Sequence, residues 1–487
     1  MTTDRCAHDS ELVRFVRISI APAAAFGSSF SMSLQFVLLT PFAVSLGISR
    51  TGASLIWLVG PLTGLLVQPA VGWLSDMYHR VHATRLPIVC VASVTLVVAH
   101  LGIAFSKPAA DFMSVSPIIL LVASFLVFDA ANNAIVVTMR AMLADRFGKE
   151  HRTFAFSVLQ FWTSLGQIAG YCVAQLQWGR LETNLYMSFL VSAVMVAFST
   201  VLSALSVYEK RACRMRFHGR STGSGFKLNK FFLEPCLRVI VVGSFLTWFG
   251  WFAQQIYQSD WVSTDVLGLG DPAKGVKLSA LGLLIGSGLS CLTGLLLPVF
   301  LTYTGNDSAT LFRIWALSSI VQGCVLVSAP LVSSLLGALV WEASVGPMFA
   351  IALTVPFMLV ASGCDHGSSG RIMALVNVAV CLPQLVVILL GSILTMLTPN
   401  AYLVLFVTGG IMCATAAKLL WVPSSTDLPP WSQSPALSMS LSNSGLYSSI
   451  RDNVLFEEAP SPVFRIRGLT EPLLAPKSDW LEEPLFE

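Results

Sequence analysis

The stretch "FDAANNAIVVTMRAMLADRF" at residues 128–147 places an aspartate and an arginine within an otherwise apolar segment. Asp129 stands near the middle of the apolar run, and Arg140 stands nearer its end. A charged side chain is costly in the hydrocarbon core of a bilayer, so it normally faces other helices or a water-filled cavity. Whether this segment is a membrane helix is decided by the sequence around it.

The composition of the chain is that of a membrane protein. Hydrophobic residues make up 55% of it and charged residues only 11%, whereas soluble proteins carry about 25% charged residues. Apolar runs of about 20 residues recur along the chain, as expected for helices that cross a lipid bilayer. The net charge of +3 is small, so no nucleic-acid partner is indicated.

Twelve segments have the length and apolar content of membrane-spanning helices. A basic segment, 208–236, separates six of them in an N-terminal half (18–207) from six in a C-terminal half (237–421). The expected helices are 18–44, 53–74, 86–106, 116–143, 153–175, 184–207, 237–258, 277–300, 310–330, 335–361, 372–397 and 401–421. We therefore expect an all-α membrane protein with two six-helix halves, the layout of secondary transporters whose substrate site lies between repeats.

The distribution of basic residues predicts the orientation of these helices. Arginine and lysine cluster after the second, fourth and sixth expected helices, and cytoplasmic loops carry such an excess. These residues are Arg80, Arg85, Arg146, Lys149, Arg152, Lys210, Arg211, Arg214, Arg216, Arg220, Lys227 and Lys230. The N-terminus (1–17), the basic linker and a Ser/Pro-rich, disordered tail (422–487) are thus expected in the cytoplasm. We expect the plasma membrane rather than an internal one.

Three pairs of glycines have the spacing that lets helix backbones approach closely. They are Gly60 and Gly64, Gly166 and Gly170, and Gly282 and Gly286. Small residues four apart on a membrane helix allow tight crossings. We expect such crossings here, with the boundary between the two halves as one candidate place.

Asp129 and Arg140 share one face of their helix. Eleven residues at 100° each bring Arg140 to within about 20° of Asp129, roughly 16 Å further along. Asn132 and Asn133 lie on the same side between them. This polar stripe should line a cavity or a helix contact, because lipid cannot solvate it. A static polar pair that ties helices together is the structural alternative.

Five longer stretches, in order along the chain, carry a more specific signal. They are "SLQFVLLTPFAVSLGIS" (33–49), "ASLIWLVGPLTGLLVQPAVGWLSD" (53–76), "FDAANNAIVVTMRAMLAD" (128–145), "WFAQQIYQSDWV" (251–262) and "NVAVCLPQLVV" (377–387). Together they resemble the sucrose/proton symporters of plants, in the glycoside-pentoside-hexuronide:cation symporter-like branch of the major facilitator superfamily. The resemblance implies the major facilitator fold and proton-coupled transport of a sucrose-like sugar or glucoside.

The resemblance also implies roles for particular residues. In that family the acid matching Asp129 is the proton site, and the arginine matching Arg140 is needed for transport. Burial disfavours a charged carboxylate and a nearby cation favours it, so Asp129 could take up and release a proton. For Arg140, extension toward the membrane interface is the alternative. Asp76 and Arg80 match the superfamily's gating loop between its second and third helices.

A neutral sugar needs amides and hydroxyls around an apolar platform. The candidates are Gln35, Asn132, Asn133, Gln160, Gln167, Trp251, Gln254, Asn377 and Gln384. Hydrogen bonding between helices is the alternative for each amide, and anchoring at the membrane interface is the alternative for Trp251. Glu342 is the other acid within an expected helix, either a second titrating group or part of an outer vestibule.

Two other functions remain open: a facilitator of another small solute without proton coupling, and a non-transporting sugar sensor. Nothing in the sequence favours an enzyme, because no metal cluster or nucleophile motif is present. We expect no metal and no cofactor; the expected partners are a small sugar, protons and the lipid bilayer.

Overall fold

The computed structural model describes residues 11–48, 56–176, 181–207, 235–268, 272–305, 307–363 and 369–421. Within these ranges the chain forms helices and no β-strand. Residues 1–10, the tail 422–487 and all of the linker 208–236 except its last two residues lie outside the described part.

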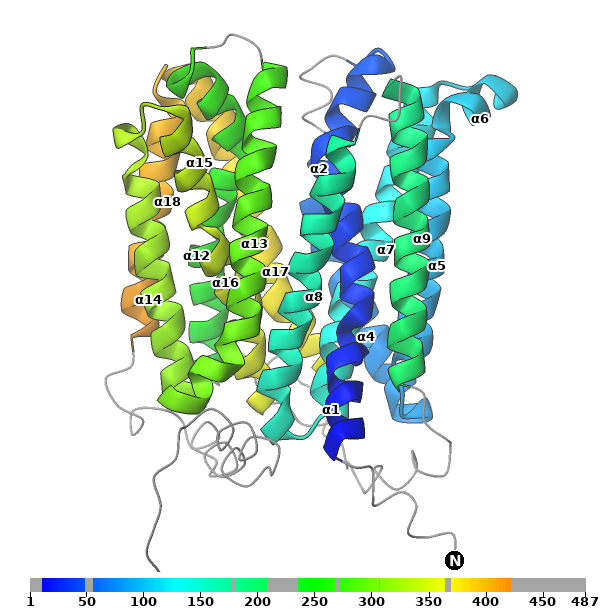
Figure 1. The fold of residues 1–487 in the computed structure, drawn as a ribbon, viewed down its shortest axis with the longest axis vertical. Coiled ribbons are helices and arrows are strands. Elements are labelled where there is room, and N and C mark those ends of the chain that lie inside the picture. Colours follow the sequence, from blue (N-terminus) through cyan, green and yellow to red (C-terminus); the bar gives the residue numbers. More distant parts are fainter. Residues whose placement is uncertain are drawn as a thin grey trace, which may run out of the picture. The chain divides into compact units, whose positions relative to one another are not determined.

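The helices form two groups that lie side by side (Figure 1). The first comprises α1 (Glu11–Ile20), the 3-10 turn η1 (Ala21–Ala23), α2 (Ala24–Ser45), α4 (Val59–His82), α5 (Leu86–Ala104), α6 (Ser106–Met113), α7 (Pro117–Arg146), α8 (Lys149–Gln175) and α9 (Leu181–Val207). The second comprises α12 (Pro235–Trp261), the π turn η2 (Val262–Val266), α13 (Pro272–Thr304), α14 (Ser308–Val327), the 3-10 turn η3 (Ala329–Leu331), α15 (Leu335–Ser344), α16 (Gly346–Gly363), α17 (Ser369–Leu397) and α18 (Ala401–Leu420).

Twelve spans cross the membrane, six in each half. Ten stretches of the described residues are long and apolar enough for this, four in the first half and six in the second. The other two spans are α4 and α8, which carry more polar side chains. They pack against α17 and α13 of the opposite half, so those side chains meet protein instead of lipid. The predicted fold class and multi-pass arrangement are confirmed.

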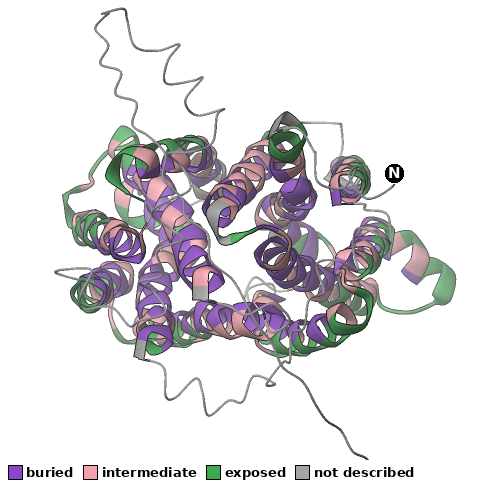
Figure 2. Cartoon of the chain, turned by 90° about the horizontal axis from the view of Figure 1, so that it is seen from below, coloured by how far each residue is buried: buried purple, intermediate pink, exposed green. Residues whose placement is uncertain are grey.

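The outer surface of the bundle is apolar, as a lipid-facing surface must be. Buried residues face the inside of each half, and exposed residues face outward (Figure 2). Large apolar side chains such as Leu66, at 72% exposure, and Leu205, at 71%, point away from the protein. In water such a surface would aggregate; in a bilayer it is matched to its solvent.

The expected single helix at 335–361 is wrong in one respect, because the chain breaks it at Val345. α15 ends at Ser344, and α16 begins at Gly346 and is followed by Pro347. Proline lacks an amide hydrogen and disfavours helical geometry in the residue before it. At this break, the Cβ of any residue other than glycine at position 346 would overlap the carbonyl oxygen of Gly286.

The first two spans are longer at the basic end of the bundle than expected. The first begins with α1 at Glu11 instead of residue 18, so part of the expected N-terminal segment 1–17 is helical. The second, α4, continues past residue 74 to His82. Ala83 then takes a left-handed conformation (φ 53°) and ends the helix.

The glycine pairs do mark close crossings, but only one pair lies between the halves. Gly64 faces Cys381 of α17, whereas Gly166 and Gly170 face the backbone of α2 within the same half. Gly282 and Gly286 likewise face α15 of their own half. The sequence reading missed another crossing between halves, at which Gly72 of α4 and Gly370 of α17 each face the other's carbonyl oxygen.

Gly166→Leu is expected to prevent correct folding, because its side chain would overlap the Phe26 carbonyl in α2. Gly288→Leu is the matched control, since no atom lies within 4 Å of a Cβ at that position. Monodisperse yield in detergent should fall strongly for the first variant and stay near wild type for the second. Equal yields of both would show that this crossing tolerates a side chain.

Candidate functional site

The carboxylate of Asp129 is buried between α7 and α4, at 3% exposure. Thr63 on α4 donates its hydroxyl to Asp129 Oδ2, and Asn133 Nδ2 donates to the same oxygen at 2.8 Å. Gln68 Nε2 in turn donates to Asn133 Oδ1 at 2.5 Å. The acid is therefore held by neutral donors. It also lies close to α17, since Asp129 Oδ1 and Gln384 Nε2 are each 3.9 Å from the position of a Cβ at Gly60.

Arg140 joins the two halves, and its side chain does not extend toward the membrane interface. It is 6% exposed, and its Nη1 donates to Asn377 Oδ1 on α17 at 2.8 Å. The guanidinium carbon lies 3.7 Å from the ring centroid of Phe357 on α16. No acid of the described residues forms an ion pair with Arg140. Asp129 and Arg140 are therefore not paired with each other, and each has its own neutral partners among the described residues.

A buried ionic cluster fastens the two halves together at the basic end, where α4 ends. Arg85 donates through Nη2 to Asp76 Oδ1 at 2.7 Å and through Nε to Asp145 Oδ2 at 2.6 Å. Its Nη1 donates to Ser75 at 2.6 Å, and its side chain has 0% exposure. All of these groups belong to the first half.

The two aspartates of this cluster hold the start of α17. The amides of Gly370 and Arg371 donate to Asp76 at 2.8 and 3.1 Å, and the Ser369 hydroxyl donates to Asp145 at 2.6 Å. A carboxylate at a helix N-terminus satisfies free amides and complements the helix dipole. The basic end of the boundary between the halves is therefore closed.

Of the two predicted gating residues, only Asp76 occupies this closure. Arg80 is exposed, and its Nε donates to the backbone carbonyl of Asp76 at 3.3 Å. The sequence reading counted Arg85 only among the basic loop residues and missed Asp145, Ser369 and Arg371. The spacing of these residues gave no signal, because Asp145 and Ser369 are 224 residues apart in the chain.

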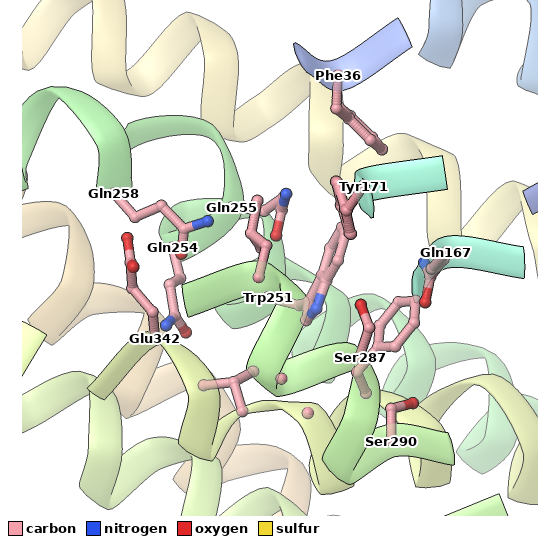
Figure 3. A pocket seen from close by; sticks show the side chains of 15 residues that line it. Phe36, Gln167, Tyr171, Trp251, Gln254, Gln255, Gln258, Ser287, Ser290 and Glu342 are labelled. Atoms are coloured by element: carbon pink, nitrogen blue, oxygen red, sulfur yellow. The ribbon is translucent and has the colours of Figure 1, made fainter. Parts of the chain in front are cut away.

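A pocket lies between the halves, with α2 and α8 on one side and α12, α13, α15 and α16 on the other. It holds ≈ 500 Å³ of empty space, part of which is open to solvent. Trp251 stands near its centre and stacks on Phe349 with ring centroids 5.0 Å apart (Figure 3). Phe36 of α2 also lines it.

The polar walls of the pocket consist of amides, hydroxyls and one acid. They are Gln167, Tyr171, Gln254, Gln255, Gln258, Ser287, Ser290 and Glu342. None of the described lining residues carries a positive charge. Gln160 stands behind this wall, where its Nε2 donates to Ser164 and Ser290 at 3.0 Å each.

The predicted sugar-binding residues divide into two groups. Trp251, Gln254 and Gln167 line the pocket. The other six do not line it. Four of them form hydrogen bonds with other side chains: Asn132 with Ser28, Asn133 with Asp129, Asn377 with Arg140, and Gln160 with Ser290. Gln35 and Gln384 also lie outside the pocket wall.

Several pocket residues were missed, although one signal could have found two of them. Trp251, Gln254, Gln255 and Gln258 are spaced three and four residues apart, so they share a face of α12. Tyr171 and Ser287 carried no comparable signal.

Comparison with known proteins places the chain in a family. Residues 23–388 match the family model described as Major Facilitator Superfamily. Sucrose transport protein SUC4 of Arabidopsis thaliana is 27% identical over 441 residues, which cover 78% of this chain and 84% of that protein. Sucrose transport protein SUT2 of Oryza sativa subsp. indica is 27% identical over 433 residues, covering 76% and 85%.

Solved structures share the fold at lower identity. A proton:xylose symporter, XylE, bound to 6-bromo-6-deoxy-D-glucose is similar with a TM-score of 0.60 and 17% identity, covering 85% of this chain and 96% of that one. A bacterial homologue of the iron transporter ferroportin in an outward-facing state is similar with a TM-score of 0.64 and 14% identity, covering 83% and 98%. The protein is thus a transporter and not an enzyme, and the chain belongs to the major facilitator superfamily.

Proposed function

We propose that this protein is a proton-coupled symporter of a sucrose-like sugar or glucoside that works by alternating access. The observation that carries the proposal is the pocket between the halves, with its central tryptophan, its amides and hydroxyls, and no cation among its described lining residues. An aromatic face packs on the C–H surface of a sugar, and amides both donate to and accept from its hydroxyls. The similar plant proteins are sucrose transport proteins, which agrees with this substrate class.

Asp129 is the proposed proton site. Its contacts from α4 and its closeness to α17 place it where the halves meet. Movement of one half against the other would change both its hydrogen bonds and its access to water. A carboxyl group in such a place binds a proton on one side of the membrane and releases it on the other. The same movement would break or rearrange the hydrogen bond of Arg140 to Asn377, which crosses the boundary.

The direction of opening follows from the proposed orientation. With both termini in the cytoplasm, the closed basic end is the cytoplasmic end, and the pocket is accessible from outside. Release of sugar into the cytoplasm then requires that the hydrogen bonds from the start of α17 to Asp76 and Asp145 break. We propose the plasma membrane as the location of this import.

Uptake of labelled sucrose, maltose and glucose into transport-deficient cells tests the proposal. At least one sugar should accumulate above its external concentration, and a protonophore should abolish the accumulation. Uptake should rise as the external pH falls, because each pH unit adds about 1.4 kcal/mol to the inward proton gradient at 25 °C. Equilibration that ignores the protonophore would indicate a facilitator. Sugar binding without uptake would indicate a sensor.

A further inference from the structure

Glu342 occupies an unusual place in the wall of the pocket. It lies in α15, directly before the break at Val345, and its side chain is 4% exposed. Gly282 of α13 lies against it and leaves room for it, because a Cβ at position 282 would overlap the carboxyl group. The fold thus makes space for an acid beside the sugar pocket.

Polar atoms near Glu342 are buried without partners. Among the described residues, neither carboxylate oxygen of Glu342 has a hydrogen-bond partner, and the same is true of both side-chain amide atoms of Gln254 and of Gln258 Nε2. These two glutamines are 3% and 1% exposed. The hydroxyl of Ser279 also lies beside the carboxylate but makes no well-formed hydrogen bond. Burying such groups unsatisfied is unfavourable, so a bound molecule is expected to complete them.

All three side chains lie on one side of the pocket. Figure 3 shows Gln254, Gln258 and Glu342 close together. Trp251 lies between this group and Gln167, which is on the opposite wall. By contrast, Asn133 and Asn377 form hydrogen bonds within the protein: Asn133 donates to Asp129, and Asn377 accepts from Arg140. The unsatisfied groups therefore gather where a substrate would be.

The chemistry of this wall specifies its ligand. An ionised carboxylate only accepts hydrogen bonds and offers two oxygens side by side, so it matches a pair of neighbouring O–H donors. The adjacent amides can donate to the oxygens of the same hydroxyls and accept from a third group. No described ion-pair partner competes for Glu342.

We propose that Glu342, with Gln254 and Gln258, binds two adjacent hydroxyls of the transported sugar and so selects glycosides with a free vicinal diol. This inference rests on the proposed function and adds a substrate contact in the C-terminal half, separate from the proton site at Asp129. Glu342 acts here as an acceptor of sugar hydroxyls, and the proton stoichiometry does not depend on it.

Sugar binding to purified protein tests this, with whichever of sucrose, maltose and glucose the wild type binds and with its monodeoxy analogues. Glu342→Gln keeps the shape of the side chain but exchanges an acceptor for a donor. It should weaken binding roughly ten- to a hundredfold, as loss of hydrogen bonds to a charged group does. Two of these analogues, each lacking one of two neighbouring hydroxyls, should bind the wild type with similarly reduced affinity. Glu342→Gln should reduce their affinity little more.

Gln258→Leu removes a donor and keeps the charge of Glu342. If Glu342→Gln does not fold, the sugar affinity of Gln258→Leu tests the same two hydroxyls. Gln322→Leu is the control: Gln322 is equally buried in α14 but bonds the Thr247 carbonyl, outside the pocket. Its sugar affinity should stay near wild type. Proton:sugar stoichiometry in reconstituted vesicles should be the same for wild type and Glu342→Gln.

Unchanged sugar affinity in Glu342→Gln would overturn the inference. A changed proton stoichiometry would also overturn it and would make Glu342 a second proton site. The same analogue preferences in wild type and both pocket variants would also overturn it. In either case the proposed function would stand. If the wild type bound none of the three sugars, the proposed function would fail together with this inference.

Discussion

Asp129→Asn is expected to abolish accumulation of sugar against its gradient and to leave exchange of sugar across the membrane intact. Asparagine has the shape of a protonated aspartate, and its carbonyl oxygen can still accept from Thr63 and Asn133, the two donors at this site. The loaded carrier can therefore form. It cannot release a proton inside, so the proton gradient no longer drives transport. Counterflow and uphill uptake, measured in the same vesicles, separate the two activities.

Asp111→Asn is the matched control, because Asp111 is exposed on α6 and lies outside the boundary between the halves. It should accumulate sugar like the wild type. Asp129→Glu should be intermediate, since it keeps the titrating group but shifts it by a methylene toward Thr63. Persistent proton-driven accumulation in Asp129→Asn would refute the assignment, and loss of all sugar binding would mean that Asp129 contacts sugar itself or holds α7 in place.

Arg85→Ala is expected to destabilise the protein by about 3–5 kcal/mol, the usual effect of removing one partner of a buried ion pair. Arg85 has 0% exposure and bonds both Asp76 and Asp145. Without it, two carboxylates remain buried with too little positive charge around them, and they no longer hold the start of α17. Thermal unfolding in detergent, followed by tryptophan fluorescence, should show a large decrease in melting temperature, and uptake should be lost.

Arg80→Ala provides the comparison within the same turn of chain. Arg80 is exposed and, among the described residues, donates only to a backbone carbonyl, so its loss should change stability by at most about 0.5 kcal/mol. Equal destabilisation by the two variants would show that the buried cluster does not stabilise the closed state.

Some of this organisation could be predicted from the sequence, because it depends on local composition. Apolar runs of helical length predict most of the spans regardless of how they pack, and the basic segment 208–236 lies between the two sets of six in the sequence. The spacing of Asp129, Asn133 and Arg140 gives one polar face, and all three residues are indeed shielded from lipid. The motifs in order along the chain also indicated the major facilitator superfamily, which the match over residues 23–388 confirms.

What the sequence could not give was the partner of each polar side chain, since partners here are far apart in the chain. Asn377 and Gln254 are both buried amides, but Asn377 is bonded to Arg140 whereas Gln254 faces the pocket unsatisfied. Arg85 looks like any basic loop residue until α17 is brought beside Asp76. In a bilayer, lipid fixes only which residues must be apolar; the packing of one helix against another decides which buried polar group meets protein and which is left for substrate.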